Sequence, residues 1–270
     1  MKDVKDKLVL VTGGASGIGR LMALDFARRK ARVAVWDLNP GGVKALEEEA
    51  RRGGLSITGA VCDISDRAAV YRQAEALMAG LGPVDILINN AGVVSGTPLL
   101  ETADEKILAG LGVNALSLFW TCKAFLPAML ERNSGHIVTI SSAAGIIGVT
   151  GLTEYCAGKF AAFGFHEALR MELRRRRSAI RTTVVCPFYI DTGMFKGVKT
   201  RFPLLLPILK SEDAARRIAA GVLKNKRRLI MPRLVYFIYF LRLLPVPVMD
   251  FIADFLGICH SMDDFKGRTG

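Results

Sequence analysis

The stretch LVLVTGGASGIG, residues 8–19, joins a run of apolar and β-branched residues to a glycine-rich turn. Residues 8–12 predict a buried strand, and apolar residues at helical spacing follow from Ile18. Gly13, Gly17 and Gly19 allow the chain to turn sharply and let backbone N–H groups approach an anion at a helix N-terminus. Glycine-rich turns are common, but this position between a strand and a helix favours a site for a dinucleotide pyrophosphate.

The same strand–helix alternation continues along most of the chain. Further strands are predicted at residues 32–36, 55–61, 84–90, 136–142, 180–187 and 229–231. Helices are predicted at residues 18–30, 43–52, 67–81, 105–132, 153–177 and 211–224. This rhythm implies parallel strands joined by right-handed crossovers. We therefore predict an α/β fold, a single-domain Rossmann-type doubly wound parallel sheet with helices on both faces, over residues 1–270.

The composition fits a globular protein and argues against several other classes. Apolar residues make up 51% of the 270 residues, enough for a large core, which excludes intrinsic disorder. The five cysteines are scattered without any CxxC spacing, which predicts reduced thiols in the cytoplasm and no metal site. The opening MKDVKDK leads directly into the first strand, so no secretory signal is predicted.

The net charge of +12 raises the question of a polyanionic partner. Much of the excess lies in short basic runs at residues 28–30, 174–177 and 224–228, where cations complement the negative end of a helix dipole. No aromatic residues alternate with these runs as a nucleic-acid stacking platform requires, so we predict no nucleic-acid partner. Attraction to a membrane surface remains open.

An acidic residue ends the second predicted strand, eighteen residues after Gly19. Asp37 in this place can accept hydrogen bonds from both ribose hydroxyls of NAD and would repel the 2′-phosphate of NADP. Alternatively, Asp37 only forms the turn before Asn39 and Pro40. NAD is therefore the predicted cofactor, and NADP the less favoured one, because Arg20 could still reach a phosphate.

A tyrosine and a lysine lie four residues apart in Tyr155-Cys156-Ala157-Gly158-Lys159, on one face of a predicted helix. A phenol is a poor base at neutral pH, and a nearby ammonium stabilises the phenolate. Ser142 ends the preceding strand, at the edge of the sheet where a substrate would bind, and can hydrogen-bond the substrate oxygen. The three side chains together predict acid–base chemistry at Tyr155.

These motifs resemble the short-chain dehydrogenase/reductase family over at least residues 7–195. TGGASGIG, Asp63, NNAG, GVNALS, ISS and YCAGK follow one another in the family's order and spacing. The resemblance implies an enzyme with a catalytic tetrad of Asn114, Ser142, Tyr155 and Lys159. Asn114 would hold a water that links Lys159 to solvent, and Lys159 would also bind the nicotinamide ribose. The implied cofactor site comprises Gly13, Ser16, Gly17, Ile18, Gly19, Asp37, Leu38, Asp63, Ile64, Asn90, Ala91, Gly92, Tyr155, Lys159, Pro187, Ile190 and Thr192.

Within the family, VWDLN, TTVVCPF, DTGMF and the closing DDFKGRTG resemble the branch of retinol and 17-beta-hydroxysteroid dehydrogenases. That branch interconverts lipophilic alcohols (retinoids, steroids, fatty alcohols) and their aldehydes or ketones. The sequence departs from it by showing no hydrophobic anchor before the first strand. It also has Phe188 where much of the family has glycine, which brings a ring to the pocket. The predicted substrate contacts are Ser142, Tyr155, Phe188 and Met194.

The last third of the chain is strongly apolar. Residues 192–210 are expected to form the substrate loop, and residues 233–270 an apolar extension that prolines and charges interrupt before it reaches spanning length. The extension either packs over the core and the pocket or rests on a membrane surface. The protein would accordingly be cytoplasmic, with peripheral membrane contact as an open possibility.

Self-association is implied by the resemblance, because in this family the helices that carry Asn114 and Tyr155 pair across a two-fold axis. A homodimer or homotetramer is expected. Four apolar side chains could serve the contact or could instead face the sheet: Leu116, Phe119, Phe163 and Leu169.

Two other functions compete with the dehydrogenase. A sensor or scaffold that binds dinucleotide without turnover would have no need of the complete Asn, Ser, Tyr and Lys set. A sugar-nucleotide epimerase of the family's extended branch is disfavoured by the short apolar C-terminal part.

Overall fold

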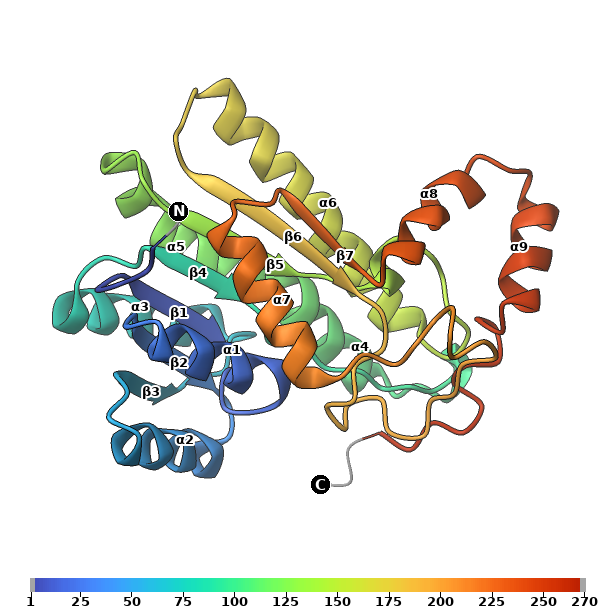
Figure 1. The fold of residues 1–270 in the computed structure, drawn as a ribbon, viewed down its shortest axis with the longest axis horizontal. Helices are drawn as coiled ribbons and strands as arrows, with labels where there is room; N and C mark the ends of the chain where they lie inside the picture. The colour runs from blue at the N-terminus through green and yellow to red at the C-terminus, as the bar shows by residue number, and fades with distance from the viewer. Residues whose placement is uncertain (1–2, 268–270) are drawn as a thin grey trace.

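Seven parallel strands form the centre of the molecule in the computed structural model, which describes residues 3–267 (Figure 1). The strands are β1 Leu8–Thr12, β2 Arg32–Asp37, β3 Ile57–Val61, β4 Ile86–Asn89, β5 His136–Ile140, β6 Arg181–Pro187 and β7 Arg228–Met231. Their order in the sheet is β3-β2-β1-β4-β5-β6-β7. The order therefore reverses between β1 and β4, which opens a crevice at the carboxyl ends of these strands.

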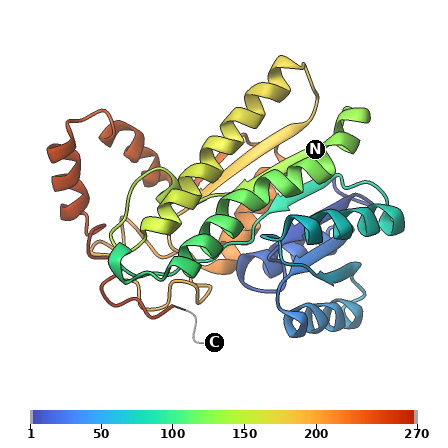
Figure 2. The ribbon, with the colours of Figure 1, turned by 180° about the vertical axis from the view of Figure 1, so that it is seen from behind.

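Helices cover both faces of the sheet (Figures 1 and 2). They are α1 Gly17–Arg28, α2 Pro40–Arg52, α3 Arg67–Leu81, α4 Asp104–Leu111, α5 Ser117–Glu131, α6 Thr153–Arg175, α7 Ser211–Leu223, α8 Ile238–Leu241 and α9 Val246–Phe255. Short helical turns are η1 Leu99–Glu101, η2 Gly112–Leu116, η3 Ala143–Gly145 and η4 Arg233–Phe237. One core cluster lies between the sheet and α1 and α7, and a second between the sheet and α3 and α5. The predicted doubly wound fold is confirmed.

The helix predicted over residues 105–132 is not regular throughout. It consists of α4, a π-helical turn at η2, and α5. Asn114 lies within the π-helical turn, where the extra residue in the turn displaces the backbone. By length and composition, Asp104–Glu131 is the one helix in residues 3–267 that could cross a membrane. It packs against α3 and α6, as the apolar core helix of an α/β domain does.

Other predicted boundaries differ by one to three residues, and at two of them a side chain caps the end of an element. Helix α2 begins at Pro40 because Asn39 accepts a hydrogen bond from the Gly42 amide and proline suits the first helical turn. Strand β5 ends at Ile140, two residues before its predicted end. Ser142 instead caps η3 by accepting a hydrogen bond from the Ala144 amide.

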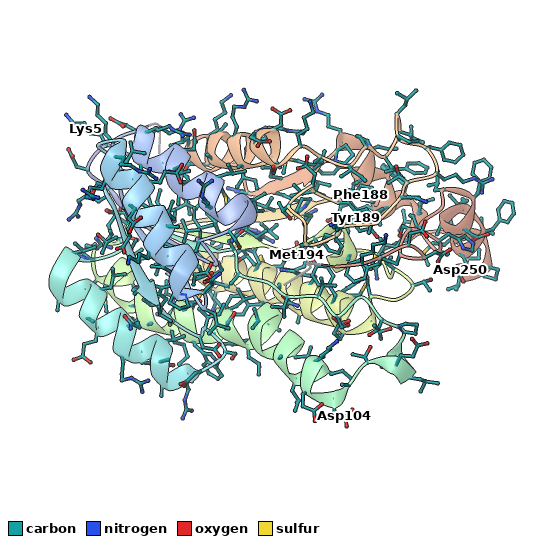
Figure 3. The ribbon with its side chains drawn as sticks, turned by 90° about the horizontal axis from the view of Figure 1, so that it is seen from below. Lys5, Asp104, Phe188, Tyr189, Met194 and Asp250 are labelled. Atoms are coloured by element: carbon teal, nitrogen blue, oxygen red, sulfur yellow. The ribbon has the colours of Figure 1, made fainter. Side chains whose placement is uncertain are left out.

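The C-terminal part leaves the body of the molecule after β7. Helices α8 and α9 and the chain between them extend to one side, as both ribbon views show (Figures 1 and 2). Asp250 of α9 accordingly lies at the opposite end of the molecule from Lys5 (Figure 3). The last residues of the DDFKGRTG motif, 268–270, lie outside the described residues.

Candidate functional site

A single cavity of about 590 Å³ runs from the glycine turn after β1 to the C-terminal part of the chain. Its wall contains all the predicted cofactor and substrate residues, and Lys159 and Tyr155 lie at its centre. Asn114, the one other predicted site residue, does not line it. The structure thus brings together residues from the carboxyl ends of six strands, β1 to β6, and their roles stay predictions.

The glycine turn leaves no room for side chains. Gly13 has φ +61°, and a Cβ there would lie 2.7 Å from the Ala91 Cα. A Cβ on Gly19 would lie 2.1 Å from the Gly13 carbonyl oxygen. The Asn90 amide holds this turn by donating to the carbonyl oxygens of Thr12 and Gly13, at 2.9 and 3.0 Å. The turn therefore brings bare backbone and the N-terminus of α1 to the cavity wall, which suits a pyrophosphate.

Asp37 lines the cavity and also stabilises the backbone around it. One carboxylate oxygen accepts a hydrogen bond from the Ala15 amide at 2.9 Å, and the other from the Asn39 amide at 3.0 Å. Both interpretations of this residue, turn former and cavity residue, are therefore compatible. Arg20 forms an ion pair with Glu49 and does not line the cavity, so it is engaged away from any phosphate there.

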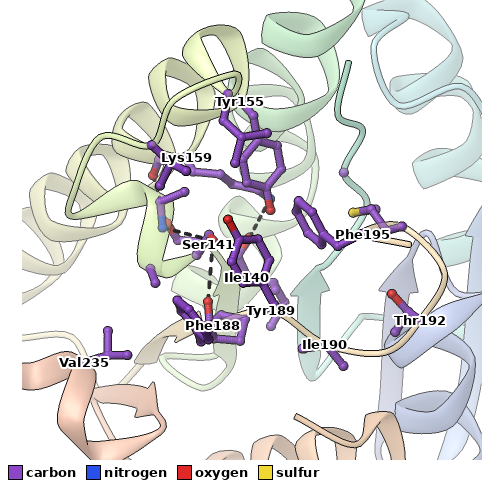
Figure 4. A pocket seen from close by; sticks show the side chains of 18 of the residues that line it. Ile140, Ser141, Tyr155, Lys159, Phe188, Tyr189, Ile190, Thr192, Phe195 and Val235 are labelled. Carbon is purple, nitrogen blue, oxygen red and sulfur yellow. Dashed lines mark hydrogen bonds between the residues drawn. The ribbon is translucent and has the colours of Figure 1, made fainter. Parts of the chain in front are cut away.

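Tyr155 lies in the first turn of α6 and directs its hydroxyl into the cavity, beside the rings of Phe195 and Tyr189 (Figure 4). Burial raises the pKa of the Tyr155 phenol, and a hydrogen bond with Ser142 partly offsets this effect. Ser142 reaches the phenol from the turn after β5, with its own hydroxyl 3.5 Å from the Pro187 carbonyl oxygen. The predicted Ser–Tyr pair is thus assembled from two separate segments.

Lys159 is buried one helical turn after Tyr155. Its Nζ donates to the Ile140 carbonyl oxygen at 3.0 Å and lies 5.6 Å from the centre of the Tyr155 ring. Burial lowers the pKa of Lys159 to about 8. From the sequence we expected the Lys159 ammonium to lower the pKa of the Tyr155 phenol. Among the protein's own groups, burial has the largest effect on this pKa, and burial raises it.

Asn114 lies behind the cavity wall, where it is fully engaged with backbone. Its amide donates to the Val93 carbonyl oxygen at 2.8 Å, and its carbonyl accepts from the Val93 amide at 3.1 Å. A Cβ on Gly92 would lie 3.1 Å from the Asn114 Oδ1 and 3.2 Å from the Lys159 Nζ. Asn114 Oδ1 and Lys159 Nζ therefore both lie next to Gly92, and the predicted water between Asn114 and Lys159 stays a prediction.

The substrate side of the cavity contains Tyr189, which sequence reasoning did not assign, and Phe195, which it placed only in the substrate loop. Tyr189 is buried beside Phe195, with ring centres 5.1 Å apart, and its hydroxyl hydrogen-bonds Ser261 at 2.9 Å. Phe195 in turn packs edge-on against Tyr155, at 5.6 Å. The only sequence feature that pointed to these rings was the aromatic content of PFYIDTGMF, residues 187–195. A segment without regular secondary structure has no periodicity that would show which of its side chains are buried.

The apolar C-terminal extension also contributes to the wall, which agrees with packing over the pocket. The extension residues that line the cavity are Leu234, Val235, Phe237, Ile238, Leu241, Ile252, Phe255, Leu256, Gly257, Ile258 and Ser261. Other side chains of the same segment point outward and are exposed. Both faces of the segment are therefore apolar, and only one is covered.

The four candidate contact residues for self-association divide into two pairs. Leu116 and Phe119 are 48% and 45% exposed, so they are accessible to another chain. Leu169 is buried in the core against the sheet, and Phe163 is partly buried. Within residues 3–267, no group of three or more His, Cys, Asp or Glu side chains could hold a metal ion.

Comparison with known proteins agrees with this geometry. The family model described as short chain dehydrogenase matches residues 7–201. The chain is 46% identical over 270 residues to epidermal retinol dehydrogenase 2 of Mus musculus, covering 99% of this chain and 87% of that protein. It is 38% identical over 293 residues to retinol dehydrogenase 10 of Homo sapiens, covering 98% of this chain and 86% of that protein.

Two solved structures show the same fold. A short chain dehydrogenase/reductase from Burkholderia phymatum in complex with NAD has a TM-score of 0.81 at 24% identity, covering 90% of this chain and 95% of that one. A metagenomic short-chain oxidoreductase in complex with NADP has a TM-score of 0.71 at 27% identity, covering 84% of this chain and 97% of that one.

Proposed function

The chain belongs to the short chain dehydrogenase family, and from that premise we propose that it is an NAD-dependent oxidoreductase of a lipophilic alcohol, with retinol as the first candidate substrate. The observation that carries the proposal is the position of the Tyr155 hydroxyl. It is hydrogen-bonded to Ser142 inside a cavity whose one end is a glycine turn and whose other end is apolar. A dinucleotide and a lipophilic alcohol could meet there. The retinol dehydrogenases among the relatives support the substrate class.

The residues at the glycine-turn end of the cavity fit a dinucleotide. Bare backbone at Gly13 and Gly19 and the N-terminus of α1 would receive the pyrophosphate. The Asp37 carboxylate lines the same wall and would receive the ribose hydroxyls. The ion pair between Arg20 and Glu49 keeps a cation away from this wall, which favours NAD over NADP.

Bound NAD supplies the acceptor for the hydride that leaves the alcohol carbon. Burial disfavours the Tyr155 phenolate, so the positive charges of Lys159 and of the bound nicotinamide would have to stabilise it. The phenolate would then accept the hydroxyl proton of the alcohol, while Ser142 donates a hydrogen bond to the same substrate oxygen. The products are the aldehyde or ketone, NADH and one proton held by Tyr155. Lys159, next to Tyr155 and with a pKa of about 8, is suited to exchange that proton near neutral pH, with Asn114 behind it.

Apolar walls serve this chemistry in a second way. Phe195, Tyr189 and the extension would exclude water from the reacting atoms and present an apolar wall to the substrate. The reverse reaction, reduction of the carbonyl, uses the same groups with the Tyr155 phenol as donor.

The test is a substrate screen with the purified protein. Retinol, steroid alcohols and fatty alcohols are each incubated with NAD, and separately with NADP, and reduced nicotinamide is followed by absorbance. We expect turnover with at least one lipophilic alcohol and a preference for NAD. Tight NAD binding without turnover across the whole panel would instead support a non-catalytic sensor.

We also propose that the protein is cytoplasmic, touches a membrane peripherally, and self-associates as a dimer or tetramer. The exposed Leu116 and Phe119 on the helix that carries Asn114 support self-association. Sedimentation velocity of wild type and of Phe119→Ser tests it, because an outward-facing contact residue should shift the protein toward smaller species. Sedimentation of the variant identical to that of wild type would argue against this face.

A further inference from the structure

The mouth of the cavity is rimmed by apolar side chains that are both part of the wall and open to the outside. Leu205, Leu234, Phe237 and Phe255 line the cavity and are 45%, 36%, 49% and 52% exposed. They come from three segments far apart in sequence: the substrate loop, η4 and α9. The cavity therefore opens onto an apolar surface.

The apolar surface continues outward along residues 238–255, which we call the apolar arm. Phe240, Leu243 and Phe251 of the arm are 66%, 82% and 71% exposed, and none of them lines the cavity. Every residue from 242 to 248 is exposed. Soluble monomers rarely expose a continuous apolar surface of this kind unless something covers it.

The apolar arm is attached to the body at defined points. Arg242 donates to the Ile146 carbonyl oxygen at 3.1 Å, and its guanidinium lies 5.4 Å from the centre of the Phe160 ring. At the base of the arm, the Arg228 guanidinium lies between the rings of Phe163 and Tyr239, at 5.3 and 5.2 Å. The outer face of the arm is thus held in a fixed orientation beside the mouth.

The continuity of this surface with the cavity indicates what covers it. A protein partner seated on the mouth residues would close the route by which substrate enters. A fluid hydrocarbon phase would cover the same side chains and leave the route open. Asp250 and Asp254 of α9 are exposed beside the apolar side chains, so attraction to anionic headgroups is not expected to be the main force.

We propose that the outer face of the apolar arm inserts into the surface of a lipid bilayer, and that the lipophilic substrate enters the cavity from the hydrocarbon, between the mouth residues. The inference rests on the proposed function: the substrate is the lipophilic alcohol proposed above, and the apolar arm is the surface that makes the peripheral membrane contact. Burial of exposed apolar side chains supplies the driving force.

Flotation with vesicles of phosphatidylcholine alone tests the lipid contact. The variant Phe240→Ser/Leu243→Ser/Phe251→Ser removes three outward side chains that do not themselves line the cavity, although Phe240 packs against Phe237 of the wall. Each should weaken partitioning about tenfold, as expected for one large apolar side chain. The matched control is Leu100→Ser/Leu108→Ser, which changes leucines that are 99% and 71% exposed on η1 and α4. Those elements lie near Asp104, at an edge of the molecule away from Asp250 (Figure 3).

Wild type and the control variant should float, and the triple variant should not, with unchanged thermal melting. The contact is refuted if wild type stays in solution, if the triple variant floats like wild type, or if flotation requires phosphatidylserine. Conversion of an oligomer into monomers by the triple variant, without lipid, would show instead that a second copy of this chain covers the surface.

The route is tested separately by presenting the same alcohol in two forms, dissolved in vesicles and dispersed in dilute detergent. The triple variant should lose most of its kcat/KM with the vesicle-borne alcohol and retain the wild-type value with the dispersed one. Equal loss in both forms, or no loss in either, would overturn the route. If wild type turns over no alcohol in either form, the proposed function fails while the flotation result stands on its own.

Discussion

The dinucleotide end of the cavity is defined by backbone contacts, whereas the substrate end is defined by packing of apolar side chains. At the first end, Gly13 and Gly19 have no space for a methyl group, and Asn90 and Asp37 hydrogen-bond the surrounding amides and carbonyls. At the second end, the wall consists of aromatic and aliphatic side chains from irregular chain and from the extension. Backbone geometry tolerates few replacements, and apolar packing tolerates many of similar volume.

The largest effect is expected where the two ends meet, at Tyr155. Tyr155→Phe keeps the ring and its contact with Phe195 but removes the hydroxyl. We expect kcat to fall about 1000-fold, within the range for loss of a general acid–base group. Titration calorimetry should give an unchanged Kd for NAD, since the dinucleotide end is intact. Turnover within a few-fold of wild type would exclude the proposed role of Tyr155.

A smaller effect concerns the buried Lys159, which belongs to the same junction. Its pKa is about 8 in the folded protein, below the usual 10.5, so between these pH values the unfolded chain binds more protons and stability rises with pH. Lys159→Met removes this contribution. The free energy of unfolding of wild type, relative to that of the variant, should rise by up to ~3 kcal/mol over this window.

The measurement is urea unfolding of both proteins, without dinucleotide, across that pH range. Titration of Cys62 and Cys122, whose pKa values burial raises, occurs in both proteins and cancels in the difference. Cys186 interacts with Lys159, so Cys186→Ala is introduced into both proteins. If the difference in the free energy of unfolding does not change with pH, the pKa of Lys159 is not lowered in the folded protein.

The backbone-defined end is tested by adding a methyl group. Gly19→Ala places a Cβ against the Gly13 carbonyl oxygen and should destabilise the protein by about 2 kcal/mol. It should also weaken NAD binding. Gly80→Ala is the matched control, because nothing lies within 4 Å of a Cβ at that helical position, and it should stabilise by up to about 1 kcal/mol. Equal melting temperatures for the two variants would contradict the comparison.

Cofactor preference should respond to Asp37. In Asp37→Ser the negative charge that would repel a 2′-phosphate is gone, so the ratio of kcat/KM for NAD to that for NADP should fall about tenfold or more. Glu49→Gln is the companion variant, since it releases Arg20 from its ion pair. If Asp37→Ser leaves the ratio unchanged, Asp37 only stabilises the turn through its hydrogen bonds with the Ala15 and Asn39 amides.

The smallest effect is expected at the packing-defined end. Phe255→Leu at the half-exposed mouth keeps an apolar side chain of lower volume, so KM for a lipophilic alcohol should change only about threefold, less than 1 kcal/mol. KM for NAD should not change. If Phe255→Leu lost as much stability as Gly19→Ala, the substrate end would tolerate replacements no better than the glycine turn.

The sequence features that could be interpreted were those that depend on local backbone conformation. The glycine turn, the strand–helix alternation and the four-residue spacing of Tyr155 and Lys159 depend on neighbours in sequence, so the fold could be predicted from them. Most of the other residues found in the cavity wall were predicted from the family resemblance. The prediction of a regular helix over 105–132 was wrong at Asn114, because the π-helical turn forms where this helix packs against α6.

The sequence by itself determined the parallel α/β fold and the glycine turn, because both follow from short-range backbone conformation. The tetrad was predicted from the order and spacing of motifs that resemble a known family, and its roles stay predictions. Only the tertiary structure decided that Arg20 pairs with Glu49 and that burial, not Lys159, dominates the pKa of Tyr155. It also decided that one face of the apolar extension lines the cavity while the other stays uncovered. Ion pairing and burial depend on which distant segments pack together, and no spacing along the chain encodes that directly.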